Sequence, residues 1–339
     1  MIGERVRELR ERAGWSLAEL GRRSGMSRQT LLAVEQGAMP RLDTAHALAR
    51  ALGVSLDALV AVPDEPLWAG APTSFARWAR VGDRLILHPC TDWAADVRTT
   101  PEGPVPLSGA RDAESTLVLA GCDPALPDLA ARFEAESQDV HVLTRNATSR
   151  EALDWLQRGW VHASGLHLAH PRGYNRPYAE ALGRPAVGYR LVTWEAGLAA
   201  RTQKDLDRWP DLWQEGRVAV RPEGSEARAL QDRMAARDKL PPTHLPLVEA
   251  ASHVEAARAV AVGAADAAVM TRSAAALFGL TFRPWSVEPI DWVAPLPLDP
   301  RLERFFAFLS RAQVRRRLGV VPGYDASESG RLMWETAVP

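Results

Sequence analysis

The sequence predicts two structured domains, an all-α N-terminal domain of five helices and a larger α/β domain, joined by a short β-containing connector. Residues 3–61 consist of short amphipathic segments separated by turns. From residue 115 onward, strand-like and helix-like segments alternate, which is typical of an α/β fold. The segment PDEPLWAGAPTS between them breaks helical periodicity with prolines and small residues. We therefore expect domains at 1–62 and 114–339, with the connector at 63–113.

The N-terminal helices have chemically defined ends. The stretch SLAELGRRSGMSRQTLLAVEQG predicts two short helices, with Ser16 capping the first and Ser27 the second. Gly25 stands where the first helix must end. The segment RVRELRERAGW predicts a helix before this pair, and TAHALARALGVSLDALV predicts two helices after it. A tight turn between two capped helices is the arrangement of a DNA-reading motif.

The second helix of the pair carries two different faces. Leu31 and Val34 face the core, whereas the other face presents short or fork-shaped side chains that are typical of groups reading base edges. This face is formed by Arg28, Gln29, Thr30 and Ala33. Its surroundings resemble the XRE family, the Cro and lambda-type repressor helix-turn-helix, over about residues 3 to 61.

The resemblance implies that the start of the second helix lies at the DNA groove, that Arg41 contacts phosphate, and that Arg10 pairs with Glu35. The full expected DNA-binding set is Ser16, Ser27, Arg28, Gln29, Thr30, Ala33 and Arg41. The alternative is a small helical bundle in which these residues are only solvated.

The connector contains one clear strand pattern. ARVGDRLILHP alternates around Arg84 to His88, and a turn-rich segment follows, so residues 76–110 are expected to form a small β element. A structureless linker is the alternative.

The α/β part offers three strand-to-helix junctions. They lie at Gly121–Pro124 after STLVLA, at Asn146–Ser149 after VHVLT, and at Arg221–Arg228. In such sheets ligands bind beyond the carboxyl ends of strands, where free N–H groups at helix N-termini favour anions. A plain helix cap is the alternative at each junction.

These segments, in the order AGCDPAL, TSREALDWLQRGWVHASGLHL, GYNRPY, WEAGLA, RPEGSEARALQD and HVEAARAVAVGAADAAV, resemble the periplasmic-binding-protein-like domain of molybdate- and molybdopterin-related regulators over about residues 115 to 285. The resemblance implies a bilobal type-II binding fold with a ligand cleft between its lobes. The residues expected near the ligand are Cys122, Asp123, Thr148, Ser149, Tyr174, Asn175, Ser225 and Arg228. Molybdate, tungstate or a molybdopterin-type compound is the expected effector.

Three other interpretations remain open. In the first, an organic solute stacks on Trp155, Trp160 and Trp194, although tryptophans in an α/β domain usually belong to the core. In the second, the larger domain binds no ligand and only dimerises the protein. An enzyme is the least favoured class, because the GxSxG elbow, the phosphate loop and the GxGxxG fingerprint do not occur.

Composition excludes several classes. No run approaches the roughly 18 apolar residues that a membrane span needs, and the N-terminus lacks the apolar region of a secretory signal, so we expect a cytoplasmic protein without a membrane partner. Cys90 and Cys122 are the only cysteines, which excludes a disulfide framework. His162, His167 and His170 lack metal-site spacing, so we expect neither a metal nor a required cofactor.

Together these patterns predict a one-component transcriptional regulator without catalytic residues. Its expected partners are a double-stranded DNA operator, a small-molecule effector and a second copy of the chain in a homodimer.

Overall fold

A computed structural model describes residues 2–52, 54, 56, 59, 66–90, 94–241 and 248–337. The chain divides into two compact units, Met1–Trp68 and Ala69–Pro339.

The first unit is the helical domain that the sequence predicts. Its described helices are α1 (Ile2–Arg12), α2 (Leu17–Ser24), α3 (Arg28–Glu35) and α4 (Leu42–Leu52). The Ser16 and Ser27 hydroxyls accept hydrogen bonds from the third backbone N–H after each, at 3.2 and 3.1 Å, so both predicted caps are present. The predicted last helix, in SLDALV, lies largely outside the described residues. The core of this unit contains Val6, Leu20, Leu31, Val34, Leu48 and Leu59.

The second unit begins with a small antiparallel sheet in the order β3-β2-β4-β5. After β1 (Leu67–Trp68), its strands are β2 (Phe75–Val81), β3 (Arg84–Pro89), β4 (Val97–Thr100) and β5 (Gly103–Pro106). The strand expected at Arg84 to His88 is therefore present. Ala79 on β2 is fully buried in the same core cluster as Val118 and Ala120. The small sheet therefore packs on the α/β part of the chain.

The α/β part has two lobes. The first contains β6 (Thr116–Gly121), α6 (Leu126–Glu136), β7 (His141–Asn146), α7 (Ser149–Arg158), β8 (Ala163–Leu166), β9 (Ala169–His170), β10 (Gly173–Tyr174) and α8 (Arg176–Glu180). The second contains α9 (Gln203–Asp207), α10 (Trp209–Glu215), β12 (Val218–Val220), α11 (Glu226–Arg237), β13 (Val248–Glu249), α12 (His253–Ala261), β14 (Ala267–Thr271) and α13 (Arg272–Leu277).

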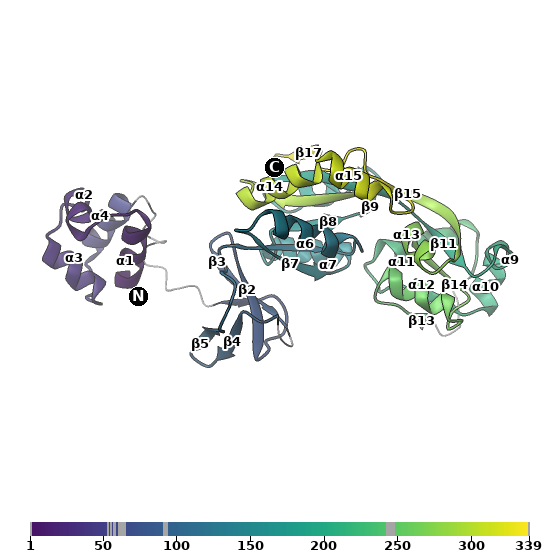
Figure 1. The fold of residues 1–339 in the computed structure, drawn as a ribbon, viewed down its shortest axis with the longest axis horizontal. Coiled ribbons are helices and arrows are strands. Elements are labelled where there is room, and N and C mark those ends of the chain that lie inside the picture. The colour runs from purple at the N-terminus through teal and green to yellow at the C-terminus, as the bar shows by residue number, and fades with distance from the viewer. Residues whose placement is uncertain are drawn as a thin grey trace. The chain divides into compact units, whose positions relative to one another are not determined.

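Two long antiparallel strands, β11 (Ala186–Ala200) and β15 (Thr281–Pro295), join the lobes. The main sheet runs in the order β13-β12-β14-β11-β15-β8-β6-β7, so these two strands stand between the strands of each lobe. In Figure 1, β11 and β15 run from one lobe to the other, and the C-terminal helices in yellow lie over the first lobe. The returning elements are α14 (Pro300–Leu309), α15 (Ala312–Gly319), β16 (Tyr324–Asp325) and β17 (Leu332–Thr336).

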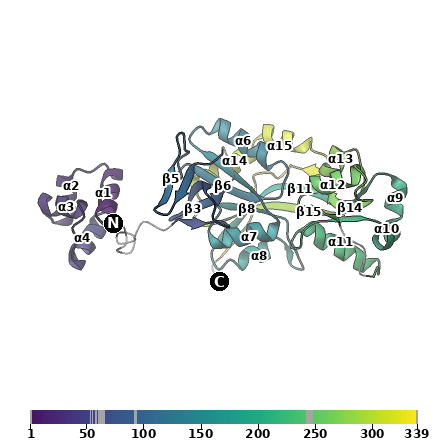
Figure 2. The same ribbon diagram turned by 90° about the horizontal axis from the view of Figure 1, so that it is seen from below.

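Alternating side chains of the sheet fill separate cores on its two faces. Leu117 and Leu119 of β6 pack with α6 and α14, whereas Val118 and Ala120 pack with α7. Figure 2 shows these helix groups on opposite sides of the sheet. The second lobe repeats the pattern with α11 on one face and α12 on the other. This doubly covered sheet explains why its strands are almost continuously apolar.

Gly197 occupies a close approach between the two long strands, next to a register shift at Ala196. A Cβ at Gly197 would lie 2.1 Å from the Arg283 carbonyl oxygen on β15. We therefore expect Gly197→Ala to lower the free energy of unfolding of the second unit by about 3 kcal/mol, because neither backbone can yield without breaking the ladder.

Gly319→Ala is the matched control, because a Cβ there meets no other atom within 4 Å. It should shift stability by less than about 1 kcal/mol. Urea unfolding followed by tryptophan fluorescence measures both variants. Equal stability of the two would contradict the constraint at Gly197.

Candidate functional site

The predicted DNA-reading residues share one property, which is exposure. Arg28, Gln29 and Thr30 form the exposed first turn of α3, directly after the Ser27 cap, and Ala33 lies one turn further along. The Ser27 hydroxyl also lies 2.8 Å from the Thr30 hydroxyl. The other three predicted residues, Ser16, Ser27 and Arg41, are exposed as well. The helix N-terminus and these side chains are therefore available to an external ligand.

A buried ion pair holds the C-terminal end of α3. Glu35 is 6% exposed, and its carboxylate accepts two hydrogen bonds from Arg10, at 2.7 and 3.0 Å. This pair is the one that the family resemblance implied. Hydrogen bonding to Glu35 outweighs burial and raises the pKa of Arg10. Arg10 also donates to the Trp15 carbonyl, so the pair ties α1 to both α3 and the turn before α2.

In the second unit, a polar cluster forms around the end of β6. The Asp123 carboxylate accepts hydrogen bonds from the Tyr324 hydroxyl and the Ala125 N–H at 2.9 and 2.7 Å. Both use Oδ1, and the buried Oδ2 has no hydrogen-bond partner among the described residues. Burial outweighs the two hydrogen bonds and raises the pKa of Asp123. The buried Oδ2 of Asp123 is therefore open to a hydrogen bond with a ligand.

His167 connects this cluster to β15. Its Nε2 lies 3.2 Å from the Cys122 Sγ and its Nδ1 lies 2.9 Å from the Glu288 carboxylate. Burial opposes the charged imidazole, but the contacts with Cys122 and Glu288 outweigh it and raise the pKa of His167 to about 10. Glu288 also accepts from the Trp194 indole N–H at 3.2 Å. A protonated, buried histidine thus stands beside Cys122.

The second lobe contributes two buried side chains, the guanidinium of Arg221 and the imidazole of His253. Arg221 is 4% exposed, donates to the Ala251 carbonyl at 3.0 Å, and leaves its Nε without a described partner. Burial lowers its pKa, while Cys122, Glu255 and Glu151 act in the opposite direction. His253 is also buried, and its Nδ1 has no described partner.

The His253 ring contacts Trp194 edge-on, with centroids 5.6 Å apart. Burial, Arg221 and His167 together hold the pKa of His253 well below its ordinary value, so this ring is neutral. Trp194 in turn contacts the rings of His167 and Tyr324, with centroids 4.9 and 6.1 Å apart. Side chains of both lobes therefore meet around Trp194.

The junctions predicted as ligand sites face one another. A Cβ at Gly224, before α11, would lie 3.5 Å from the Arg150 side chain at the start of α7. Thr148 and Ser225 cap α7 and α11, and Thr148 forms a capping box with Glu151. The Ser149 hydroxyl accepts from the His167 N–H at 3.2 Å. Cys122, Asp123 and Ser149 thus belong to one cluster, with Thr148 and Ser225 at its edges.

Glu226, the first residue of α11, also lies at this edge. It is 3% exposed, accepts a long hydrogen bond from the Ala169 N–H at 3.4 Å, and pairs with Arg233 at 2.7 Å. Its negative charge is therefore compensated inside the second lobe. Tyr174 is half-buried nearby, where burial, Glu288 and Glu226 raise its pKa to about 12.

Two predicted ligand residues have other contacts. The Asn175 side chain is fully buried, and it accepts from the Leu168 N–H at 2.8 Å and donates to Asp291 at 2.9 Å and to the Pro289 carbonyl at 3.2 Å. Its hydrogen-bonding capacity is used within the protein, where it fastens β10 to β15. Arg228 is partly exposed and pairs with Asp232, one turn along α11, at 3.2 Å. The buried guanidinium of this junction is that of Arg221.

Sequence reasoning did not select Arg221, His253, Glu288 and Tyr324 for the cleft. The available signal was position, because Arg221 directly follows β12 and His253 begins α12, both at strand-to-helix connections. The proposed tryptophan wall is not present. Trp155 and Trp160 pack on the core at one face of the sheet, whereas Trp194 belongs to the core on the other face.

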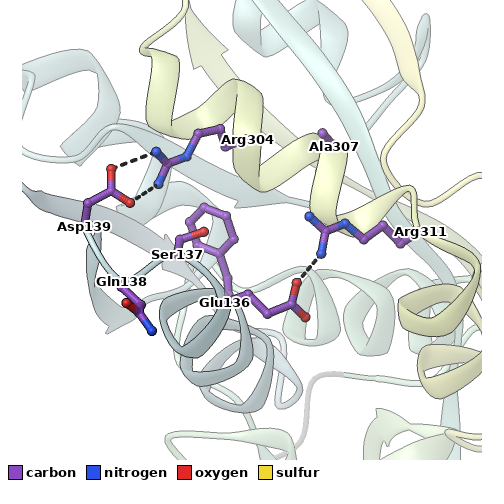
Figure 3. A pocket seen from close by; sticks show the side chains of 8 residues that line it. Glu136, Ser137, Gln138, Asp139, Arg304, Ala307 and Arg311 are labelled. Carbon is purple, nitrogen blue, oxygen red and sulfur yellow. Dashed lines mark hydrogen bonds and ion pairs between the residues drawn. The ribbon is translucent and has the colours of Figure 1, made fainter.

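A surface depression of about 470 Å³ lies between the end of α6 and α14. Figure 3 shows its charged side chains paired with each other, Asp139 with Arg304 and Glu136 with Arg311. The two Asp139–Arg304 contacts are both 2.8 Å. These mutually neutralised groups make the depression a poor candidate for ligand recognition.

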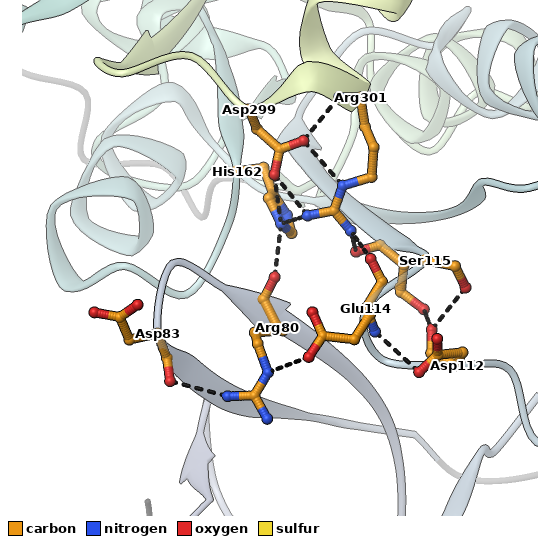
Figure 4. A network of polar contacts seen from close by, with 9 residues as sticks. Arg80, Asp83, Asp112, Glu114, Ser115, His162, Asp299 and Arg301 are labelled. Atoms are coloured by element: carbon orange, nitrogen blue, oxygen red, sulfur yellow. Dashed lines mark hydrogen bonds and ion pairs between the residues drawn. The ribbon is translucent and has the colours of Figure 1, made fainter. Parts of the chain in front are cut away.

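A second polar network fastens the small sheet to the first lobe (Figure 4). His162 accepts from the Val118 N–H at 2.9 Å and its Nε2 lies 3.0 Å from the Arg80 carbonyl. Arg80 pairs with Glu114 at 2.7 Å, and Arg301 lies 2.8 Å from the same His162 nitrogen. Burial and Arg301 lower the pKa of His162 to about 4. The network is structural, since its partners are protein groups.

Within the described ranges, no group of three or more histidine, cysteine or acidic side chains is arranged to hold a metal ion. Likewise, none of the described helices has the length and apolar character to cross a membrane.

The fold defines a bilobal domain of the α/β class, preceded in the chain by a helix-turn-helix domain. Residues 130–310 match the model of the PBP superfamily domain, which is just over half of the 339 residues, so the chain belongs to that superfamily. Residues 6–59 match the helix-turn-helix family model. This combination fits a ligand-sensing regulator. No curated protein sequence matches the chain.

Solved structures resemble the chain only distantly. The effector-binding domain of QuiR in complex with shikimate is 13% identical, with a TM-score of 0.44, covering 57% of this chain and 94% of that one. A putative phosphate ABC transporter substrate-binding protein from Clostridium perfringens is 10% identical, with a TM-score of 0.49 and coverages of 60% and 96%. The CcmR regulatory domain of Synechocystis PCC6803 with 2-PG is 13% identical, with a TM-score of 0.46 and coverages of 57% and 95%.

The charged state of His167 predicts a pH dependence. Because its pKa in the folded protein lies above the ordinary value of 6.5, the folded state holds more protons than the unfolded state. The stabilisation is complete below about pH 6.5 and is lost as the pH rises to about 10. We expect the free energy of unfolding to fall across this window in the wild type and to fall less in His167→Gln.

His162→Gln is the control. The pKa of His162 is lowered to about 4, so its titration affects stability only on the acidic side of this window. Urea unfolding at about pH 6.5 and 9.5, followed by tryptophan fluorescence, measures the difference. An identical fall in the free energy of unfolding between these two pH values, in the wild type and in His167→Gln, would contradict the raised pKa of His167.

Proposed function

We propose that the protein is a one-component DNA-binding transcriptional regulator in which a small ligand binds between the two lobes of the second unit. The main support is the set of buried polar atoms that converge there without a described hydrogen-bond partner, namely Asp123 Oδ2, Arg221 Nε and His253 Nδ1. A buried polar group without a partner costs about 1–3 kcal/mol, so such atoms in one region favour a bound ligand. We assign no catalytic activity to the chain.

The chemistry of these groups favours a small anion. Arg221 brings a positive charge into a buried setting, and burial raises the pKa of Asp123, which lowers the repulsion between this side chain and an anion. The N-termini of α7 and α11 add backbone N–H groups near the same region. We put molybdate and tungstate first among the candidates, followed by a molybdopterin-type compound or another organic acid.

DNA binding is proposed for the exposed turn around Arg28 and Gln29. We infer a homodimer that reads two half-sites about one helical turn apart, in the cytoplasm, with ligand binding changing the affinity for the operator. Coupling between the two sites must be reciprocal, so operator DNA should also change the affinity for the ligand.

For the ligand, we expect tryptophan fluorescence of the full-length protein to change saturably with molybdate or tungstate. Arg221→Gln should raise Kd by about tenfold or more, because a charge-assisted hydrogen bond contributes about 1.5–3 kcal/mol. Arg228→Gln tests the other arginine of the junction in the same titration. Sulfate and phosphate serve as competing anions.

Equal affinity in the wild type and Arg221→Gln would contradict the role of Arg221. A response to none of the four anions would move the proposal to an organic ligand or to a dimerisation domain without a ligand.

For DNA, we expect Arg28→Ala and Gln29→Ala each to weaken binding to a fragment selected from a random pool by about 1–3 kcal/mol. Arg258→Ala removes an exposed arginine from α12 and is the charge-matched control. Fluorescence anisotropy, with and without saturating ligand, measures the affinities. Unchanged affinity in Arg28→Ala would contradict the recognition surface, and unchanged affinity with ligand would contradict the coupling.

A further inference from the structure

A second candidate binding site lies away from the cleft, between the small sheet and the first lobe. A cavity of about 220 Å³ is lined on one side by Arg77 of β2 and by His88 at the end of β3. The other side is formed by the last residues of β7, including Thr144, Arg145 and Asn146. Its volume is below the roughly 300 Å³ of a site for a drug-sized ligand, so it suits a ligand of few atoms.

His88 is buried in the wall of this cavity. It is 1% exposed, and neither ring nitrogen makes a hydrogen bond with a described residue. Burial, together with Arg145, His162 and Arg77, lowers the pKa of His88 to about 3, whereas the backbone of Trp160 acts weakly in the opposite direction. A neutral ring carries one N–H donor. The unpartnered donor is unfavourable unless a ligand accepts from it.

The two arginines of the cavity are incompletely neutralised. Arg77 is largely buried, and its Nε lies 3.5 Å from Asp96 Oδ2, a separation at which neither atom completes a hydrogen bond. The Arg145 guanidinium lies over the Trp155 ring, 5.2 Å from its centroid, and pairs with no described carboxylate. Burial and the neighbouring Arg111 lower the pKa of Arg77 against the effect of Asp96, and burial lowers the pKa of Arg145 against the effect of Cys90.

From this arrangement we infer a second binding site, specific for a small anion with a carboxylate or a tetrahedral oxyanion group, held between Arg77, Arg145 and His88. The two forked guanidinium groups match such oxygens, and the His88 N–H supplies a third donor. The hydroxyl of Thr144 and the amide of Asn146 stand at the same strand end. Because its walls belong to two different elements, a bound anion would bridge the small sheet and the first lobe.

The site is separate from the cleft proposed above. Thr148 and Ser149, which follow β7, lie at the cleft, whereas the cavity is lined by the last residues of β7 itself together with Arg77 and His88 of the small sheet. Substitutions at one site should therefore leave ligand binding at the other site unchanged. The inference does not depend on the proposed regulator function.

Isothermal titration calorimetry of the full-length protein with sulfate, phosphate and acetate tests the inference. We expect saturable binding of at least one anion, with Kd raised about tenfold or more in Arg145→Gln. Arg158→Gln is the matched control, because Arg158 also lies over a tryptophan, Trp160, at 4.9 Å, but pairs with Asp154 outside the cavity. Arg221→Gln controls for binding in the cleft.

His88→Phe provides a second variant that breaks no hydrogen bond to a described residue and should fold. It should raise the Kd of the same anion. Arg158→Gln should keep the wild-type Kd and serves as the reference. Absence of saturable binding with all three anions would overturn the inference. So would anion binding that is lost in Arg221→Gln but retained in Arg145→Gln and His88→Phe, since the anion would then occupy the cleft.

Discussion

The pairing of β11 with β15 is the constraint on which the second unit depends. Each strand is 15 residues long, and together they cross from one lobe to the other while pairing over nearly their whole length. β8 extends the sheet on one side in the first lobe, and β14 does so on the other side in the second. The loops of both lobes therefore meet beside one shared ribbon. Gly197 and the register shifts interrupt the regular ladder of this ribbon.

Charge in the cleft is arranged around this ribbon. Glu288 of β15 and Trp194 of β11 hold His167, and Trp194 also touches His253 of the second lobe. His167 is charged and paired, whereas His253 is neutral and partly unpaired, although both are buried near each other. The difference follows from partners, since Glu288 compensates only the first. A ligand anion beside Arg221 and His253 would supply the missing acceptor without disturbing the Glu288 pair.

Much of the secondary structure was predictable from the sequence, because it depends on local chemistry. The caps at Ser16, Ser27, Thr148 and Ser225 depend on residues three positions apart, and all four are present. The alternating strands and helices were also predicted, whereas the Arg10–Glu35 pair was implied by the family resemblance alone. The cleft was predicted less well because its contacts are tertiary. His167 and Glu288 are 121 residues apart, and no local pattern distinguishes the buried Arg221 from Arg228, which pairs along its own helix.

The chain path limits how a ligand signal can travel. The helix-turn-helix domain connects in sequence to the small sheet, and that sheet is fastened to the first lobe by Arg80, His162 and Arg301. The second lobe joins the first through the long strands β11 and β15, and Glu226 of α11 also contacts Ala169 of β9. Under the proposed function, a ligand shifts DNA binding only by its differential affinity for two arrangements of the lobes. An anion in the cavity beside His88 would act on the small sheet more directly, because that sheet forms one wall of its site.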